Sequence, residues 1–283
     1  MSEDMLSAFL LILETEIEMK SGKSSILKTA ALLLALVMIA AFAASCAKPD
    51  EESGTKEKEY KPSFKIGEKF KFGEYEQDNN EENGKEPIEW IVVGKDGKKA
   101  LILSVKGLDS IPFKDAPDGD ASWDSSDVRA WLNDVFYANA FSDEERNHIV
   151  KTTVPADKNP EYDTEPGTAT EDAVFLLSIA EVEKYIESDD VRKCQPTAYA
   201  VAKGVWSAGA KGNCWWLLRT PGSDRNKVAD VNVYGSVRTA GEYAQTTVDA
   251  VRPAFWIDMN EFPTPTPEPT KAPTKAPSST PAP

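Results

Sequence analysis

Three short runs rich in apolar side chains, separated by turn dipeptides, follow the first quarter of the chain. The runs cover residues 70–77, 88–94 and 100–105. An Asn-Gly dipeptide at 83–84 separates the first two runs, and an Asp-Gly dipeptide at 96–97 separates the last two. Both dipeptides are typical of tight β-hairpin turns. The pattern therefore predicts three consecutive antiparallel strands.

The middle of the chain changes to a helical period. After Ser125, a helix-capping residue, apolar side chains recur at steps of three and four, which places them on one face of a helix. They are Val128, Trp131, Leu132, Val135 and Phe136. Ser142 and Ser178 are each followed three residues later by a glutamate, the capping box that starts a helix. Three helical segments are therefore predicted, with residues 174–178 as a short buried strand.

The final third returns to strand-like runs, at residues 214–220, 228–233, 236–239 and 250–257. Strands at both ends and helices in the middle predict an α+β fold. We expect two strands of one sheet to bring four residues of this third close together. They are Trp216, Arg219, Arg252 and Trp256.

The N-terminal region has the layout of an export signal. An uncharged apolar run covers residues 29–44, after three lysines and before small residues and Cys46. This order predicts a signal peptide over residues 1–45, and the Ala-Ala-Ser-Cys sequence resembles a bacterial lipobox. A lipid on Cys46 would hold the mature protein on the extracytoplasmic face of the cell membrane. Acidic residues fit poorly before such a leader, so Met19 is the candidate true start. An uncleaved membrane-spanning helix is the alternative.

Two segments of biased composition flank a folded region. Residues 46–62 are charged and almost free of aliphatic side chains, which predicts a solvated, lipid-anchored tether. Residues 261–283 repeat Pro, Thr and Ala, which predicts an extended, disordered stalk, with or without O-glycosylation. The globular domain is expected over residues 63–260.

Composition narrows the classes of function. The 283 residues are 41% hydrophobic, which is enough for a core, and their net charge of -15 repels phosphate backbones. Nucleic acid is therefore not expected as a partner. One histidine and three cysteines leave almost nothing from which to build a His–Cys zinc site or a His-based triad.

Cys194 and Cys214 are the cysteines that remain once Cys46 carries the lipid. Two thiols in an exported protein commonly form a disulfide, and we predict one here. Two buried free thiols and a reactive site are the alternatives.

An acidic loop is the weak candidate for a metal site. Asp78, Asn80 and Glu82 supply oxygen ligands of the kind that Ca²⁺ prefers. Asn83 stands where an EF-hand loop needs glycine, and Pro87 opens a strand instead of a helix. A polar hairpin loop is therefore favoured and no cofactor is expected, with Ca²⁺ as the alternative.

Four residues form the candidate ligand-binding site. They are Trp215, Trp216, Arg219 and Arg252. Adjacent tryptophans on a strand point to opposite faces, so one should be in the core and the other partly exposed. An exposed tryptophan beside an arginine can bind a sugar ring or a peptide by stacking and hydrogen bonding. The competing interpretation is structural, with both tryptophans in the core and both arginines paired with Asp230 or Asp249.

Longer motifs occur in order along the chain. They are residues 72–75 (FGEY), Trp123 followed by 129–133 (RAWLN), 174–178 (VFLLS), 215–222 (WWLLRTPG) and 251–256 (VRPAFW). Together they resemble domain-of-unknown-function family 6273, which is found in secreted and lipid-anchored proteins of Gram-positive bacteria. The closing strands are also similar to the C-type-lectin-like, sulfatase-modifying-factor-like fold of formylglycine-generating enzymes. The resemblance implies a mixed domain with antiparallel strands at both ends, and no reaction.

These observations favour a non-catalytic binding or display domain on the cell surface, with a cell-wall glycan or a protein as ligand. The sequence shows no complete acid–base or nucleophile constellation. The alternative is a divergent enzyme, either of the formylglycine-generating type or acting on cell-wall glycan. The redox cysteine pair of formylglycine-generating enzymes has no counterpart in the last third, where Cys214 is the single cysteine.

Overall fold

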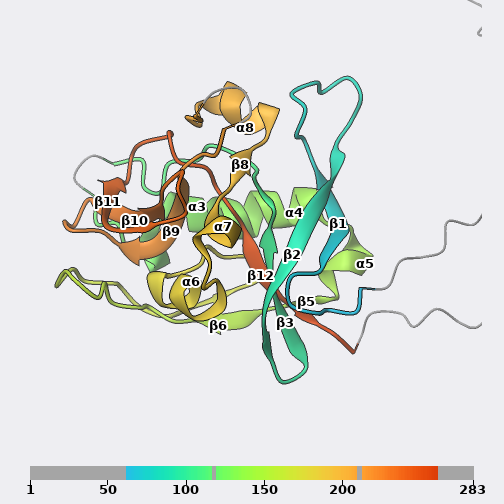
Figure 1. Ribbon diagram of the computed structural model, residues 1–283, viewed down its shortest axis with the longest axis horizontal. Helices are drawn as coiled ribbons and strands as arrows, with labels where there is room; N and C mark the ends of the chain where they lie inside the picture. The colour runs from blue at the N-terminus through green and yellow to red at the C-terminus, as the bar shows by residue number, and fades with distance from the viewer. Residues whose placement is uncertain (1–61, 117–118, 209–211, 261–283) are drawn as a thin grey trace, which may run out of the picture. The chain divides into compact units, whose positions relative to one another are not determined.

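The computed structural model describes residues 62–116, 119–208 and 212–260 (Figure 1). The signal peptide, Cys46, nearly all of the tether and the Pro/Thr-rich stalk that the sequence predicts lie outside the described residues. Within those residues, no helix is long and apolar enough to cross a membrane.

A five-stranded antiparallel sheet joins the two ends of the described domain. Its strands lie in the order β1 (Lys69–Tyr75), β2 (Glu86–Asp96), β3 (Lys99–Ser104), β12 (Ala254–Asp258) and β5 (Ile149–Val150). The three predicted N-terminal strands are therefore confirmed as antiparallel neighbours. The last strand, β12, pairs with both β3 and β5, and in Figure 1 it is the red strand inside the sheet.

An aromatic cluster packs against this sheet. Trp90 on β2 has no exposed surface, and its indole N–H donates to the Phe72 carbonyl at 2.6 Å. The Trp90 ring centroid lies 4.7 Å from that of Phe255 on β12 and 6.1 Å from that of Phe141. Because these rings come from distant parts of the chain, their burial stabilises the strand order in addition to the backbone pairing.

A separate three-stranded antiparallel sheet has the order β11 (Val237–Tyr243), β10 (Lys227–Val231) and β9 (Trp216–Pro221). Two short pairs accompany it. They are β4 (Lys106–Gly107) parallel to β8 (Gln195–Pro196), and β6 (Thr152–Val154) antiparallel to β7 (Thr170–Asp172). The mixture of helices and antiparallel strands confirms the α+β prediction.

The expectation that one sheet carries the four aromatic and arginine residues of the last third is wrong. Trp216 and Arg219 lie on β9, whereas Trp256 lies on β12 of the other sheet. Ala250 still bridges to β9, but Pro253 follows, and a proline has no N–H to continue a ladder. The chain therefore leaves one sheet before Pro253 and enters the other after it.

The helices are short. They are η1 (Trp123–Ser125), α3 (Asp127–Ala130), η2 (Trp131–Phe136), α4 (Tyr137–Ala140), α5 (Asp143–Arg146), α6 (Ile179–Tyr185), α7 (Asp189–Arg192) and α8 (Ala198–Lys203). Ser142 and Ser178 form both predicted capping boxes. Ser126 takes the capping role predicted for Ser125, because its hydroxyl accepts the Arg129 N–H at 3.3 Å.

The apolar face of the longest helical stretch differs in one residue from the prediction. Val128, Leu132 and Phe136 have no exposed surface, whereas Val135 is 47% exposed. η2 has π-helical hydrogen bonding, whose turn takes more residues than an α turn. Residues four apart therefore stay in line, and Val135 turns towards solvent.

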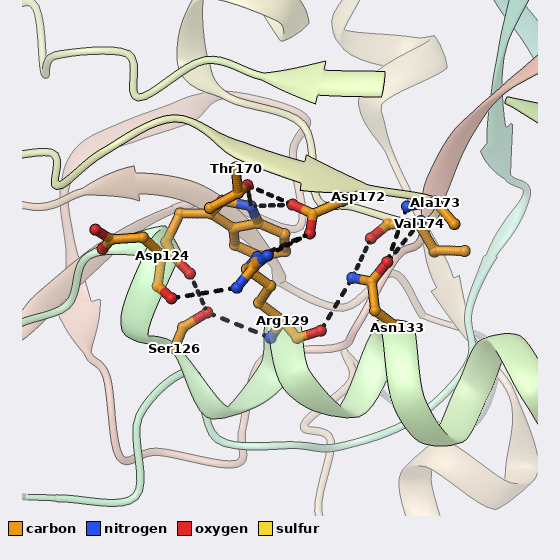
Figure 2. A network of polar contacts seen from close by, with 9 residues as sticks. Asp124, Ser126, Arg129, Asn133, Thr170, Asp172, Ala173 and Val174 are labelled. Carbon is orange, nitrogen blue, oxygen red and sulfur yellow. Dashed lines mark hydrogen bonds and ion pairs between the residues drawn. The ribbon is translucent and has the colours of Figure 1, made fainter. Parts of the chain in front are cut away.

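The Trp-Arg-Asn motif of this stretch clamps it to β7 (Figure 2). The Trp123 indole N–H donates to Asp172 Oδ2 at 2.8 Å, and Arg129 Nε donates to Asp172 Oδ1 at 2.8 Å. Asn133 Nδ2 donates to the Val174 carbonyl at 2.9 Å. Since the Asp172 side chain is only 1% exposed, these donors are what make its burial tolerable. The motif is structural.

Replacing Asp172 with Asn should lower the free energy of unfolding by about 2–3 kcal/mol, because Trp123 and Arg129 lose a charged acceptor in a buried place. Urea denaturation followed by tryptophan fluorescence measures the change. Glu89→Gln is the control, because both side chains of the Lys69–Glu89 pair are about half exposed, at 50% and 49%. That control should cost less than about 1 kcal/mol. Equal stability of the two variants would contradict the clamp.

Candidate functional site

Two tryptophans face each other across a hairpin between α8 and β9. Ser207 and Cys214 bridge its two arms, so Trp206 and Trp215 are opposed across the arms. Their ring centroids lie 5.6 Å apart, with 39° between the ring planes. Trp206 is 49% exposed, whereas Trp215 is half-buried. The hairpin therefore presents one indole to solvent with a second indole supporting it.

Arg238 on β11 contacts the supporting ring. Its guanidinium carbon lies 4.5 Å from the centroid of Trp215. Two hydrogen bonds of 2.7 Å, from Nε and Nη2, join the guanidinium to the two carboxylate oxygens of Asp230 on β10. The Asp230 side chain is fully buried, whereas 32% of the Arg238 side chain is exposed. Bidentate pairing and the cation–π contact together hold the guanidinium in one orientation.

Backbone pairing explains why these residues share a face. Leu217 on β9 pairs with Asp230, and Asp230 pairs with Arg238. Residues directly opposite one another on paired strands point to the same side of a sheet. Trp215 lies two residues before Leu217, so it joins that side.

The segment ahead of β12 adds a buried carboxyl group. The Ala250 N–H donates to the Trp215 carbonyl at 2.8 Å, which brings Asp249 close to Trp215. Asp249 has no exposed surface, and neither carboxyl oxygen has a hydrogen-bond partner among the described residues. Burial, reinforced by the charge of Asp230, raises the pKa of Asp249 to about 8. The group is therefore protonated at neutral pH, which avoids an unpaired buried charge.

Six residues make up what we call the Trp215 face. They are Trp206, Trp215, Asp230, Arg238, Glu242 and Asp249. Glu242 Oε2 lies 4.0 Å from Arg238 Nη2, and both side chains are about one-third exposed, at 30% and 32%. Burial raises the pKa of Asp230 to about 6, although the hydrogen bonds from Arg238 act in the opposite direction. The face thus offers an aromatic surface edged by one guanidinium and one carboxylate.

Of the predicted ligand residues, Trp216 and Arg252 lie in the interior. Trp216 has no exposed surface, and its indole N–H donates to the Arg192 carbonyl at 2.9 Å. The Arg252 guanidinium carbon lies 4.8 Å from the centroid of the Trp216 ring, and Arg252 is 2% exposed. Neither side chain reaches the Trp215 face.

Arg219 is also interior and joins β9 to two other segments. It forms an ion pair with Asp157 at 3.0 Å and another with Glu181 on α6. Its Nη1 donates to the Leu176 carbonyl at 2.9 Å, and its guanidinium lies 5.8 Å from the Phe175 ring centroid. With two carboxylates on one buried guanidinium, Arg219 is a packing anchor. Asp230 and Asp249 pair with neither Arg219 nor Arg252.

Sequence reasoning found Trp215 but missed Trp206 and Arg238. Trp206 had a usable signal, because Trp206 and Trp215 flank the segment 208–212, Ala-Gly-Ala-Lys-Gly, whose two glycines are typical of a turn. The sequence signal for Arg238 was weaker. This residue lies on the predicted strand that follows the strand carrying Asp230.

The two remaining cysteines lie side by side in the interior. The backbones of Cys194 and Cys214 pair in an isolated antiparallel β-bridge, in which the Cys214 N–H donates to the Cys194 carbonyl at 2.8 Å. Both are buried thiols in this structure. The two cysteines are neighbours but are not bonded to each other here, so the predicted disulfide stays a prediction.

The acidic loop brings different carboxylates together from those expected. Carboxylate oxygens of Glu76, Asp78 and Glu86 lie within 4.8 Å of one another, whereas Glu82 is outside this group. The Asn80 N–H donates to Glu76 Oε1 and to Asp78 Oδ1, both at 2.9 Å. The loop's own N–H groups therefore occupy oxygens that a Ca²⁺ ion would need.

Asp249→Asn should change how stability depends on pH. The pKa of Asp249 in the folded protein, about 8, lies above the value of about 4 in an unfolded chain. The folded protein therefore loses stability as the pH rises between these values. Asparagine cannot ionise, so from pH 5 to pH 8 the variant should gain at least about 2 kcal/mol relative to the wild type.

Urea denaturation at the two pH values measures this gain. Asp134→Asn is the control, because Asp134 is exposed on η2 and should leave the pH dependence unchanged. Parallel pH profiles for Asp249→Asn and the wild type would show that Asp249 is ionised in the folded protein.

Comparison with known proteins identifies the family. The model of a domain of unknown function, DUF6273, matches residues 97–259. No curated protein and no solved structure matches the chain. The matched range runs from the turn between β2 and β3 to the end of β12, so it includes the clamp, the buried thiols and the Trp215 face. Because the match covers more than half of the sequence, the chain belongs to the DUF6273 family.

Proposed function

We propose that residues 63–260 form a non-catalytic domain on the outer face of the cell membrane that binds glycan through the Trp215 face. The observation that carries the proposal is the half-exposed Trp206 ring, backed by Trp215 and Arg238. A ring that is already held in place loses little conformational freedom when a ligand arrives. Sugars offer an apolar ring face for stacking and hydroxyl groups for hydrogen bonds to Arg238 and Glu242.

The carboxylates of the face favour binding over catalysis. Asp230 and Asp249 have no exposed surface, and Arg238 occupies both oxygens of Asp230. Neither carboxyl group can reach a ligand that stacks on Trp206. A typical glycosidase needs two carboxyl groups on opposite sides of the scissile bond. Cleavage of a bound glycan would therefore favour the alternative of a cell-wall glycan enzyme.

The finer fold assignment belongs to the same proposal. We infer a C-type-lectin-like fold similar to that of formylglycine-generating enzymes. The support is that β1 and β12, the first and last strands of the domain, share one antiparallel sheet, while β9–β11 form another. Oxidase chemistry of the formylglycine-generating type is the second alternative function.

The display part of the proposal depends on Cys46. Changing Cys46 to Ala should release the protein from the membrane or leave the signal peptide uncleaved, because the lipid attachment point is gone. Labelling with radioactive fatty acid, followed by membrane fractionation, measures this. Cys194→Ala is the matched control and should keep the label. Persistent label on the Cys46→Ala protein would disprove lipid attachment there.

Trp206→Ala tests the glycan site. Loss of the stacking surface should weaken binding about tenfold or more, which corresponds to about 1.4 kcal/mol. The protein from residue 47 onward is screened against a glycan array and purified cell wall, and the affinity for the best-bound glycan is then measured by calorimetry.

Val135→Ala is the matched control, because Val135 is 47% exposed, close to the 49% of Trp206, but lies on η2. It should leave the affinity unchanged. Equal affinity of the Trp206→Ala and wild-type proteins would overturn the site, and absence of glycan binding by the wild type would overturn the function.

A further inference from the structure

The buried thiols lie beside a buried arginine that has no carboxylate partner. Arg252 is 2% exposed, and no carboxylate lies within ion-pair distance of it among the described residues. Its Nε donates to the Ser104 carbonyl and its Nη1 to the Arg192 carbonyl, both at 2.9 Å. These acceptors are neutral, so they satisfy hydrogen bonds without balancing the charge. An unbalanced buried charge is strongly unfavourable.

The thiol pair can supply the missing negative charge. Cys194 is 1% exposed and Cys214 has no exposed surface. Burial by itself raises the pKa of Cys194, but the hydrogen bond with Cys214, the charge of Arg252 and the Gly107 N–H together bring it below its ordinary value. The same hydrogen bond, followed by burial, raises the pKa of Cys214 well above its ordinary value. Cys194 is therefore the thiol of the pair that ionises more readily.

We propose that Cys194 and Cys214 are a reversible thiol–disulfide couple whose reduced form is stabilised by Arg252, acting as the counter-ion of the Cys194 thiolate. The disulfide predicted from the sequence is then one of two states of the pair. Forming it removes the negative charge and leaves Arg252 unbalanced. Stabilising the reduced form makes a disulfide easier to reduce. This inference does not depend on the proposed glycan site.

Exchange with a small-molecule disulfide balances without another reactant. The Cys194 thiolate attacks one sulfur of that disulfide, forms a mixed disulfide and releases a thiolate. Cys214 gives its proton to the released thiolate and attacks the Cys194 sulfur. The second half of the small molecule leaves as a thiolate, and the Cys194–Cys214 bond forms. Two electrons have passed from the cysteines to the small molecule.

A small cavity lies near the pair, lined by a neighbour of each cysteine and by neither cysteine itself. Its volume is about 180 Å³, and its lining includes Gln195, Ser207 and Gly212. Gln195 is exposed and directly follows Cys194, and Ser207 bridges to Cys214. A small molecule can therefore bind one residue away from the thiols, and exchange requires a local opening that uncovers the sulfur atoms.

Arg252→Met tests the role of the charge, because methionine keeps much of the apolar stem and loses the cation. The whole chain is equilibrated with defined ratios of reduced and oxidised glutathione, quenched with acid, alkylated and weighed by mass spectrometry. The variant should shift the equilibrium towards the disulfide by about tenfold or more. Arg252→Lys, which keeps the charge, should stay within about threefold of the wild type, and so should Trp206→Ala. An unchanged equilibrium in Arg252→Met would overturn the proposal.

Single-cysteine proteins keep the proposal testable if Arg252→Met fails to fold. With Cys46 changed to Ala in both, Cys214→Ser leaves Cys194 beside Arg252, whereas Cys194→Ser leaves Cys214. Thiolate absorbance near 240 nm, followed against pH, should show Cys194 ionising at lower pH than Cys214 and below the value of about 8.5 for a free cysteine. Ionisation of Cys194 at or above that value would overturn the proposal, as would a wild-type pair that glutathione cannot oxidise.

Discussion

The path of the chain from Asp249 to Asp258 is the constraint on which the rest of the described domain depends. Ala250 pairs with the start of β9, and four residues later Ala254 pairs with β3 and bridges to Phe175. One short segment therefore connects the three-stranded sheet, the five-stranded sheet and the buried 174–178 stretch. It also places Asp249 at the Trp215 face and Arg252 at the thiols, so the two candidate sites are three residues apart along one stretch of backbone.

Three arginines of the last third, two of them buried and Arg238 partly exposed, have their charge balanced in different ways. Arg219 has two carboxylate partners, and Arg238 has a bidentate one in Asp230. Arg252 has two backbone carbonyls and neighbouring thiols. Thiol oxidation does not alter the carboxylates that pair with Arg219 and Arg238. A thiolate disappears on oxidation, so the third is the one whose balance can change.

The tryptophans divide between structure and binding according to what backs each ring. Trp216 is enclosed by the chain and uses its N–H on a backbone carbonyl, so it has no free surface for a ligand. Trp206 packs one part of its ring on Trp215 and leaves about half of its surface to solvent. Large exposed indoles are costly to leave in water, and a rigid one is well suited to a stacking ligand. This contrast is what makes the Trp215 face the better candidate site.

Local rules explain the part of this structure that the sequence alone determined. The tight β2–β3 hairpin, both capping boxes and the opposite orientation of Trp215 and Trp216 all follow from contacts within a few residues, whereas a longer loop joins β1 to β2. The family resemblance rests on motifs that the structure shows to be packing devices, such as the clamp at Asp172. Such motifs identify a fold, and they carry no information about a ligand.

Tertiary structure alone decided which distant residues meet. Asp230 pairs with Arg238 and not with Arg219 or Arg252. The register of β10 against β11 places Asp230 directly opposite Arg238. The pattern of residues along one strand does not determine its register against another strand. The position of β12 inside the N-terminal sheet was likewise hidden, since any antiparallel edge could have received it. Trp206 became a binding candidate only when the hairpin brought it onto Trp215. The exposure of a side chain, its ion-pair partner and the balance of its charge depend on the residues packed around it, and long-range packing decides which residues those are.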